Sequence, residues 1–354
     1  MESHQYKVGI IGYGGIGGFH HERISEMNKG LKVVAAHDVD PFRLEEAGKR
    51  GLKAYAELND FLADEEIDVV LISTPNNFHK TLAIAAMNAK KHVICEKPVA
   101  MNCTELEEMM AAAEENNVLF TVHQNRRWDP DYKTACKIIK DGMVGKPFTV
   151  ESRVHGQNGI THGWRAYKVS GGGMMFDWGV HMIDQLLNFF EEAVVNVECH
   201  MHVVKTFEVD DYFKLLLRFE SGISAQVEVG TYNLYQLPRW YIGGDMGCAV
   251  IHNWEKGGGG VIKASQLAMN WEPEIVMTSA GPTRTMAPRP QETLEELPLP
   301  EVESDWLWFY DNVVDALDGK APLIVKPEQA MRVLRVIEAA FESDREKKSV
   351  KVYI

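Results

Sequence analysis

Long apolar runs are missing from this sequence of 354 residues, and no run approaches the ~20 residues that a membrane span needs. The start, MESHQYKVGI, lacks a basic stretch followed by an apolar one, so we expect no secretory signal. The five cysteines form no CxxC pair, which argues against a zinc site or a disulfide framework and favours a reducing cytoplasm. Positive charge is also scarce: the formal net charge is −14, which disfavours nucleic acid as a partner. These absences predict a cytoplasmic globular protein with no metal, no membrane and no nucleic acid attached.

Short apolar runs alternate with helical patterns over roughly the first 124 residues. Helical patterns at 81–88 and 104–115 lie between runs that are typical of buried strands. Such alternation predicts a parallel sheet with helices on both faces. The expected strands are residues 7–11, 32–37, 67–72, 92–95 and 118–122.

The pattern changes after residue 124, where strands begin to follow strands, which predicts a mixed or antiparallel sheet. Five prolines within 281–300 predict a long loop or arm. We therefore predict two domains, 1–124 and 125–354, with a C-terminal helix that is able to pack back on the first. In the second domain we expect helices at 132–140, 171–190, 306–317 and 327–342, and strands at 147–155, 194–204, 212–219, 223–229 and 240–242, with a short strand at the end.

The stretch GIIGYGGIGGFHHERI places Gly12, Gly14 and Gly17 in GxGxxG register between a strand and a helix. The first glycine permits a tight turn, the second lets the backbone approach a pyrophosphate, and the third lets helix and strand pack closely. The N–H groups that open the helix suit phosphate oxygens. Asp38 ends the next strand roughly 20 residues later, where a carboxylate can accept the ribose hydroxyls. This pattern predicts a dinucleotide-binding domain.

Asp38 also bears on the choice of cofactor. Its negative charge would repel a 2′-phosphate, and no lysine or arginine follows before Arg43. We therefore expect NAD rather than NADP. The alternative role for Asp38 is the N-cap of the helix that starts near Pro41, but Asp40 fits that role better.

Charged and polar residues follow two further strands. HVICEKPVA carries Glu96 and Lys97, and ISTPNNFH carries Thr74, Asn76 and His79. Ligands of open α/β sheets bind beyond the carboxyl ends of the strands, so these side chains are expected to face the cofactor crevice. The alternative for Lys97 is a solvated surface charge.

The stretch GGGMMFDWGVHMID combines an apolar stripe with a polar one. Asp177, His181 and Asp184 share the spacing of four and three that puts residues on one face of a helix. They lie one residue beyond a core stripe with the same spacing, so we expect a polar ridge that borders a cleft. The alternative is a capped helix with a structural histidine.

Together, GxGxxG, TPNNFH, EKP and GGGMMFDWGVHMID resemble the Gfo/Idh/MocA oxidoreductases, the group of glucose–fructose oxidoreductase and inositol dehydrogenase. The resemblance covers nearly the whole chain. It implies an α/β fold with an N-terminal Rossmann domain and a C-terminal α/β domain, whose large open, mostly antiparallel sheet often forms homodimers or homotetramers. It also implies that Lys97, Asp177 and His181 occupy the catalytic positions.

The resemblance extends to two more segments. HGWRAYK implies Trp164 and Arg165 beside the nicotinamide, and HQNRRWDP implies, more weakly, that Gln124 and Arg127 face the cofactor. The alternative for these arginines is a salt bridge between domains. We expect substrate contacts from Lys97, Asn158, Asp177 and His181, and cofactor contacts from Gly12, Gly14, Ile16, Gly17, Asp38, Thr74, Asn76, His79, Glu96, Lys97, Gln124, Trp164 and Arg165.

These groups suit the oxidation of a secondary alcohol, in which a hydroxyl loses its proton while a hydride leaves for the nicotinamide. Histidine, with an intrinsic pKa of about 6.5, can accept that proton near neutrality. Lys97 can stabilise the developing alkoxide. Either Lys97 or His181 can be the base, and we favour His181. We predict an NAD-dependent dehydrogenase of a sugar, cyclitol or glycoside, such as one that oxidises the C3 hydroxyl of a glucoside. The alternatives are a redox-neutral NAD-using glycosidase and a non-catalytic NAD-binding regulator.

Overall fold

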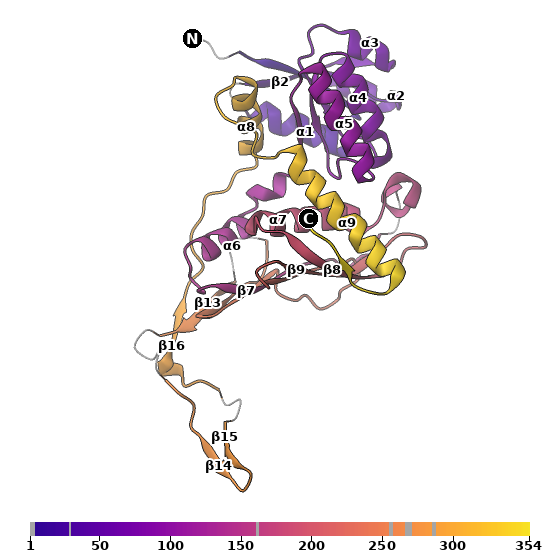
Figure 1. The fold of residues 1–354 in the computed structure, drawn as a ribbon. Coiled ribbons are helices and arrows are strands. Elements are labelled where there is room, and N and C mark those ends of the chain that lie inside the picture. The colour runs from indigo at the N-terminus through magenta and orange to yellow at the C-terminus, as the bar shows by residue number, and fades with distance from the viewer. Residues whose placement is uncertain (1–3, 28–29, 161–162, 255–257, 266–270, 285–287) are drawn as a thin grey trace.

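Two separate sheets organise the chain, with a small hairpin beyond the second (Figure 1). A computed structural model describes residues 4–27, 30–160, 163–254, 258–265, 271–284 and 288–354. None of the helices within these ranges is long and apolar enough to cross a membrane.

The first sheet has six parallel strands, so the predicted Rossmann-type sheet is confirmed. Its order is β3 (Lys53–Tyr55), β2 (Leu31–His37), β1 (Tyr6–Ile11), β4 (Val69–Ile72), β5 (His92–Cys95) and β6 (Phe120–Val122). Five of these strands match the predicted runs. The short strand β3 was not predicted, because Lys53 and Ala54 are exposed and form no apolar run. The helices of this part are α1 (Gly15–Glu26), α2 (Pro41–Lys49), α3 (Leu58–Ala63), α4 (His79–Asn88) and α5 (Cys103–Asn116).

Among the described residues the second sheet has nine strands and is mostly antiparallel, as expected, with β7 and β10 as its one parallel pair. Helices α6 (Pro130–Lys140), α7 (Val180–Phe189) and α9 (Pro327–Glu346) lie on one face, and no helix of the described residues covers the other, open face (Figure 1). The alternating burial of β9 reflects this one-sided cover. The strand order is β16 (Leu294–Leu297), β13 (Gly259–Ala264), β12 (Gly247–Ile251), β11 (Trp240–Gly244), β7 (Pro147–His155), β10 (Ser224–Gly230), β9 (Tyr212–Phe219), β8 (Val194–His202) and β17 (Val350–Lys351).

The predicted helix over 171–190 is wrong at its start. A π-helix covers Met175–Gly179 and continues directly into α7. Gly171 and Gly173 adopt positive φ angles of 72° and 101°, which keeps them out of any helix. A side chain at Gly173 would also lie 2.3 Å from Asp210 Oδ1, so only glycine fits there. This tight entry fixes where the π-helix begins.

The proline-rich segment 281–300 contains more regular structure than the predicted loop. Strands β14 (Val276–Thr278) and β15 (Gly281–Thr283) form a hairpin, and β16 joins the edge of the large sheet. Figure 1 shows the hairpin projecting far from both sheets, as an arm would.

The last two helices connect the two sheets. Helix α8 (Leu307–Leu317) packs against α1, where Tyr310 Oη lies 2.7 Å from His20 Nδ1. Helix α9 contacts α5 and β6 of the first sheet as well as α7 and β8 of the second. The C-terminal segment therefore packs back on the Rossmann part, while the boundary between 124 and 125 stays a prediction.

Candidate active site

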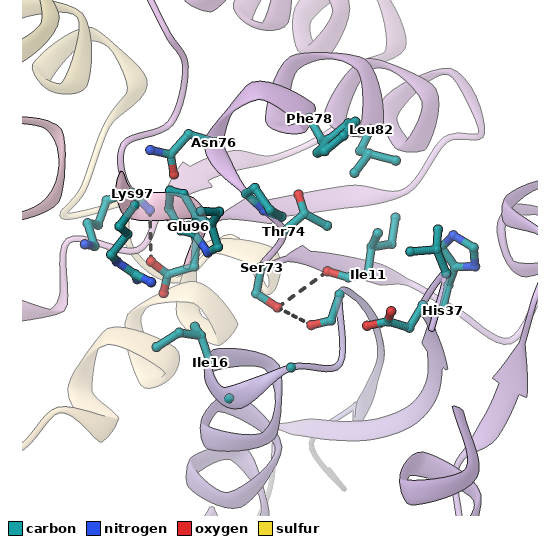
Figure 2. Close-up of a pocket in the computed structure, with 18 residues that line it drawn as sticks. Ile11, Ile16, His37, Ser73, Thr74, Asn76, Phe78, Leu82, Glu96 and Lys97 are labelled. Atoms are coloured by element: carbon teal, nitrogen blue, oxygen red, sulfur yellow. Dashed lines mark hydrogen bonds between the residues drawn. The ribbon is translucent and has the colours of Figure 1, made fainter. Parts of the chain in front are cut away.

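A cavity of about 620 Å³ lies at the carboxyl ends of the parallel strands, where the strand order reverses between β1 and β4. This is the position at which open α/β sheets bind their ligands. Figure 2 shows side chains that follow four neighbouring strands gathered around the cavity. Of the predicted cofactor residues, the cavity is lined by Gly12, Gly14, Ile16, Asp38, Thr74, Asn76, Glu96, Lys97, Trp164 and Arg165.

The glycine loop has the geometry that each glycine was predicted to allow. Gly12 has a φ of 88°. A Cβ at Gly17 would lie 2.2 Å from Gly12 O, so Gly17 packs on the loop and does not line the cavity. Gly14 has open space beside it, where a pyrophosphate can approach the backbone. Ser73 Oγ donates to Gly12 O over 2.8 Å and ties the loop to the end of β4 (Figure 2).

Asp38 faces the cavity and is held by two backbone amides. Its carboxylate accepts hydrogen bonds from Tyr13 N at 2.7 Å and from Asp40 N at 2.9 Å. The N-cap of α2 is Asp40, which accepts from Phe42 N, so Asp38 is not needed for that role. Each oxygen of a carboxylate can accept more than one hydrogen bond, so Asp38 can also take ribose hydroxyls.

Thr74 and Asn76 line the cavity, but His79 does not. Thr74 Oγ1 is buried and has no hydrogen-bond partner within the described residues, and it is therefore free for a ligand. His79 opens α4 and is completely buried, with its ring nitrogens 2.9 Å from Pro98 O and from Thr74 O. This placement corrects the prediction of a cofactor contact: His79 holds together the two loops that carry Thr74 and Lys97.

Glu96 is the centre of a buried cluster that sequence reasoning missed. Its Oε1 accepts from His20 Nε2 at 2.9 Å and from His123 Nδ1 at 2.7 Å, and its Oε2 accepts from Lys97 N at 3.0 Å. Burial alone would raise the pKa of Glu96, but His123 and His20 outweigh it and hold the pKa well below its usual range. Burial lowers the pKa of His20 to about 4. The three side chains are close enough to hold a metal, yet these short contacts already satisfy them as hydrogen bonds.

Lys97 lines the cavity and contacts Asp177, which lies eighty positions along the chain; Asp177 and His181 are not themselves lining residues. Lys97 Nζ donates to Asp177 Oδ1 at 2.9 Å and to Asp177 O at 3.0 Å. Arg165 Nε lies 3.2 Å from the same Oδ1. Burial would raise the pKa of Asp177, but Lys97 and Arg165 outweigh it and lower the pKa. An ammonium group has three N–H bonds, so one remains for a substrate oxygen.

His181 lies one turn beyond Asp177 and is almost completely buried. Its Nδ1 is 2.8 Å from Gln124 Oε1, so the structure brings Gln124 to the histidine instead of to the cavity wall. Burial lowers the pKa of His181 well below its usual range, and the charges of Lys97 and Arg126 lower it further. His181 is therefore neutral near pH 7 and able to accept a proton.

Asp184 and Asn158 lie away from the contact between Lys97 and Asp177. Arg127 contacts Asp184 through two hydrogen bonds of 2.6 and 2.7 Å, and both side chains are buried. The prediction that Asp184 continues the polar ridge is thus wrong. The π-helix changes the angle per residue between Asp177 and His181, so Asp177 and Asp184 face different partners. Arg127 thus forms a buried salt bridge, but both partners lie in the predicted second domain, so it is not the salt bridge between domains that was the alternative; Arg127 also donates to Gln329 of α9. Asn158 is exposed in the segment after β7 and does not line the cavity.

Comparisons with known proteins agree with this two-domain α/β fold. Residues 6–124 match the model of the oxidoreductase family with an NAD-binding Rossmann fold (GFO_IDH_MocA), and residues 132–250 match the GFO/IDH/MocA C-terminal domain. The chain is 29% identical to scyllo-inositol 2-dehydrogenase (NADP(+)) IolW of Bacillus subtilis, over 97% of this chain and 95% of that one. It is 30% identical to myo-inositol 2-dehydrogenase of Thermotoga maritima, over 61% of this chain and 66% of that one. The crystal structure of an NAD-binding protein from Listeria innocua is similar with a TM-score of 0.91 and 42% identity, over 98% and 99% of the two chains.

Proposed function

The chain belongs to the Gfo/Idh/MocA family of NAD(P)-dependent oxidoreductases, and from that premise we propose that it transfers a hydride between a secondary alcohol of a sugar, cyclitol or glycoside and NAD. The observation that carries the proposal is the contact of Lys97 with Asp177 at 2.9 Å, because it joins the end of a Rossmann strand to the helix of His181 beside the cavity. The C3 hydroxyl of a glucoside is one such alcohol.

The charges at the site favour an uncharged substrate. Lys97 and Arg165 both pair with Asp177, and Arg126 pairs with Asp129 at 2.8 Å. Lys97 and Arg165 share the one carboxylate of Asp177, and Glu96 next to Lys97 supplies a third carboxylate, so these three cations leave no net positive charge to neutralise an acidic substrate. A polyhydroxylated ring fits this balance, and two relatives carry the names of inositol dehydrogenases.

The cavity walls fit a nicotinamide dinucleotide. Gly14 leaves room for the pyrophosphate, Asp38 can accept the ribose hydroxyls, and Thr74 Oγ1 lacks another partner among the described residues. When bound, NAD supplies the acceptor for the hydride that leaves the alcohol carbon.

The residues of the chain then handle the proton. The remaining N–H of Lys97 donates to the hydroxyl oxygen and stabilises the charge that develops on it. His181 takes the hydroxyl proton at Nε2 as the C–H bond breaks and the C=O bond forms. Asp177 keeps the Lys97 ammonium in place through the 2.9 Å contact.

A panel of uncharged polyols tests the function. Purified protein is incubated with NAD⁺, and in parallel with NADP⁺, and with inositols, aldoses and glucosides. Growth of the NADH absorbance band with at least one of them is the expected result, and NAD⁺ should support the faster rate. No growth with any substrate would contradict the proposal, whereas release of sugar without net NADH would identify a redox-neutral glycosidase.

Removing the charge of Asp38 should weaken the preference for NAD. Asp38→Asn keeps an acceptor for Tyr13 N but no longer repels a 2′-phosphate. We expect kcat/KM with NADP⁺ to rise about tenfold relative to NAD⁺, which corresponds to ~1.4 kcal/mol. Steady-state kinetics with both cofactors measure the ratio. Asp40→Asn is the matched control, because it removes the neighbouring charge from the N-cap of α2 and should leave the ratio unchanged. A wild-type protein that already prefers NADP⁺ would contradict the assignment.

We also propose that the chain forms homodimers or homotetramers through the open face of the large sheet. Leu216 and Ile262 point outward from β9 and β13 and are 45% and 48% exposed. Apolar side chains on an uncovered sheet are typical of an interface. The five cysteines are free thiols, which agrees with the proposed reducing cytoplasm.

A further inference from the structure

A neutral histidine carries one proton on one of its two ring nitrogens, so the residue that contacts one nitrogen decides what the other can do. In His181, Nδ1 lies 2.8 Å from Gln124 Oε1. An amide oxygen only accepts hydrogen bonds, so Nδ1 must carry the proton and Nε2 must carry the lone pair. We propose that Gln124 is a positioning residue that fixes this tautomer of His181 and so makes Nε2 the proton acceptor. The tautomer of His181 is independent of the reaction, whereas the role of Nε2 as proton acceptor rests on the proposed function.

Gln124 is held firmly enough to act in this way. Its side chain is buried, with 2% of the residue exposed. Its backbone closes a tight turn at the end of β6, where Gln124 N donates to Val122 O at 2.8 Å, and Gln124 O accepts from Arg127 N at 3.2 Å. The preceding residue, His123, is anchored to Glu96 at 2.7 Å. The contact between Glu96 and His123 therefore fixes the turn that places the Gln124 side chain against His181.

Asp177 does not hold the ring of His181 in this structure. Its carboxylate contacts Lys97 at 2.9 Å and Arg165 at 3.2 Å. An aspartate or glutamate at Nδ1 would stabilise the protonated ring and raise its pKa. A neutral amide sets the tautomer without adding charge, so His181 stays unprotonated. The charged and titratable groups that act on the ring are Lys97, Arg126, Glu96 and His123.

Nitrogen NMR of the histidine rings tests the tautomer without any substrate. Protein labelled with ¹⁵N-histidine contains thirteen histidines, and comparison with His181→Gln identifies the signals of His181. At neutral pH the expected pattern is a protonated Nδ1 and an unprotonated Nε2. A protonated Nε2 in the wild-type protein would overturn the proposal. This result stands apart from the substrate panel, because it holds or fails whether or not a polyol is oxidised.

Substitution of Gln124 provides a second test of the proposal. Gln124→Glu keeps an acceptor at Nδ1 but adds a charge, so the tautomer is retained and the pKa of His181 rises. The acid limb of kcat/KM, which lies below pH 6.5 in the wild type because burial lowers the pKa of His181, then moves to higher pH. Gln5→Glu, at an exposed position just before β1 and at the amino ends of the parallel strands, adds the same charge elsewhere and leaves both the ring signals and the acid limb unchanged.

Gln124→Leu removes the acceptor and should release the tautomer. Free imidazole favours the protonated Nε2, so we expect the His181 signals to shift toward that form and kcat to fall about tenfold, with the KM for NAD⁺ unchanged. A Gln124→Leu protein with wild-type ring signals would contradict the proposal. If this variant does not fold, the wild-type spectrum and Gln124→Glu still decide the question.

Discussion

Lys97→Ala is expected to lower kcat by roughly 10²–10³-fold while the dinucleotide still binds, because the variant loses the donor that stabilises the developing alkoxide. The ammonium of Lys97 uses two of its N–H bonds on Asp177 and has one left. Alanine cannot replace this donor, and a water molecule in its place would have to be reoriented during the reaction. The loss should therefore appear in kcat rather than in the binding of cofactor.

The measurement combines steady-state turnover with titration of NAD⁺ by calorimetry. Lys140→Ala is the matched control, since Lys140 is exposed at the end of α6 and away from the cavity wall. Nearly unchanged turnover in Lys97→Ala would remove the central contact of the proposed mechanism. If NAD⁺ binding were lost as well, the lysine would be a cofactor ligand and its role in the chemical step would stay open.

The predicted site residues that line the cavity are those whose positions follow from chain direction alone. Lys97 and Thr74 come directly after buried strands, and parallel strands end at one edge of the sheet, so both line the cavity. The same rule would also place His79 at the cavity, because the rule does not take into account which way a helical side chain points. His79 is the first residue of α4 and turns inward beneath the loop. Distance from a strand end therefore predicts which loop faces the ligand, but not which side chain of that loop.

The midchain helix shows a different limit. Its spacing of four and three predicts a continuous ridge, and an α-helix would have provided one. The π-helix over Met175–Gly179 widens one turn, so Asp177 faces Lys97 while Asp184 faces Arg127. π-helices are rare and have no reliable sequence pattern, and they occur often at functional sites. Here the widened turn supplies the contact on which the proposed mechanism depends.

His20, His123 and Gln124 illustrate contacts that only the folded chain creates. Each is a polar residue that the fold buries, and a buried polar side chain needs a hydrogen-bond partner. Glu96 accepts hydrogen bonds from both histidines, one from α1 and one from the end of β6. The sequence places Gln124 two residues after β6, yet its partner His181 lies 57 positions away. Such long-range pairs require the packing of the two sheets to be known.

The buried ion pair of Arg127 with Asp184 leads to the second large effect. Its hydrogen bonds of 2.6 and 2.7 Å form a bidentate pair, and Arg127 also donates to Gln329 at 2.9 Å and to Ile324 O at 3.1 Å. Arg127→Met should lower the free energy of unfolding by about 3–5 kcal/mol, because Asp184 would keep a buried charge without a partner. Chemical denaturation followed by fluorescence measures this change, provided that unfolding is two-state.

A double substitution separates the cost of the orphaned charge from the value of the pair. Arg127→Met combined with Asp184→Leu removes both charges, so it should be more stable than Arg127→Met alone, although Gln329 and Ile324 still lose a donor. Lys137→Met is the control, because Lys137 and Asp141 form an exposed pair at 2.7 Å and its loss should cost less than ~1 kcal/mol. A double variant no more stable than the single one would mean that the bonds to α9 and its preceding loop, rather than the ion pair, hold the second sheet against the C-terminal helices. Since the backbone of Arg127 also donates to Gln124 O, that outcome would make the position of the His181 ring depend on the docking of α9.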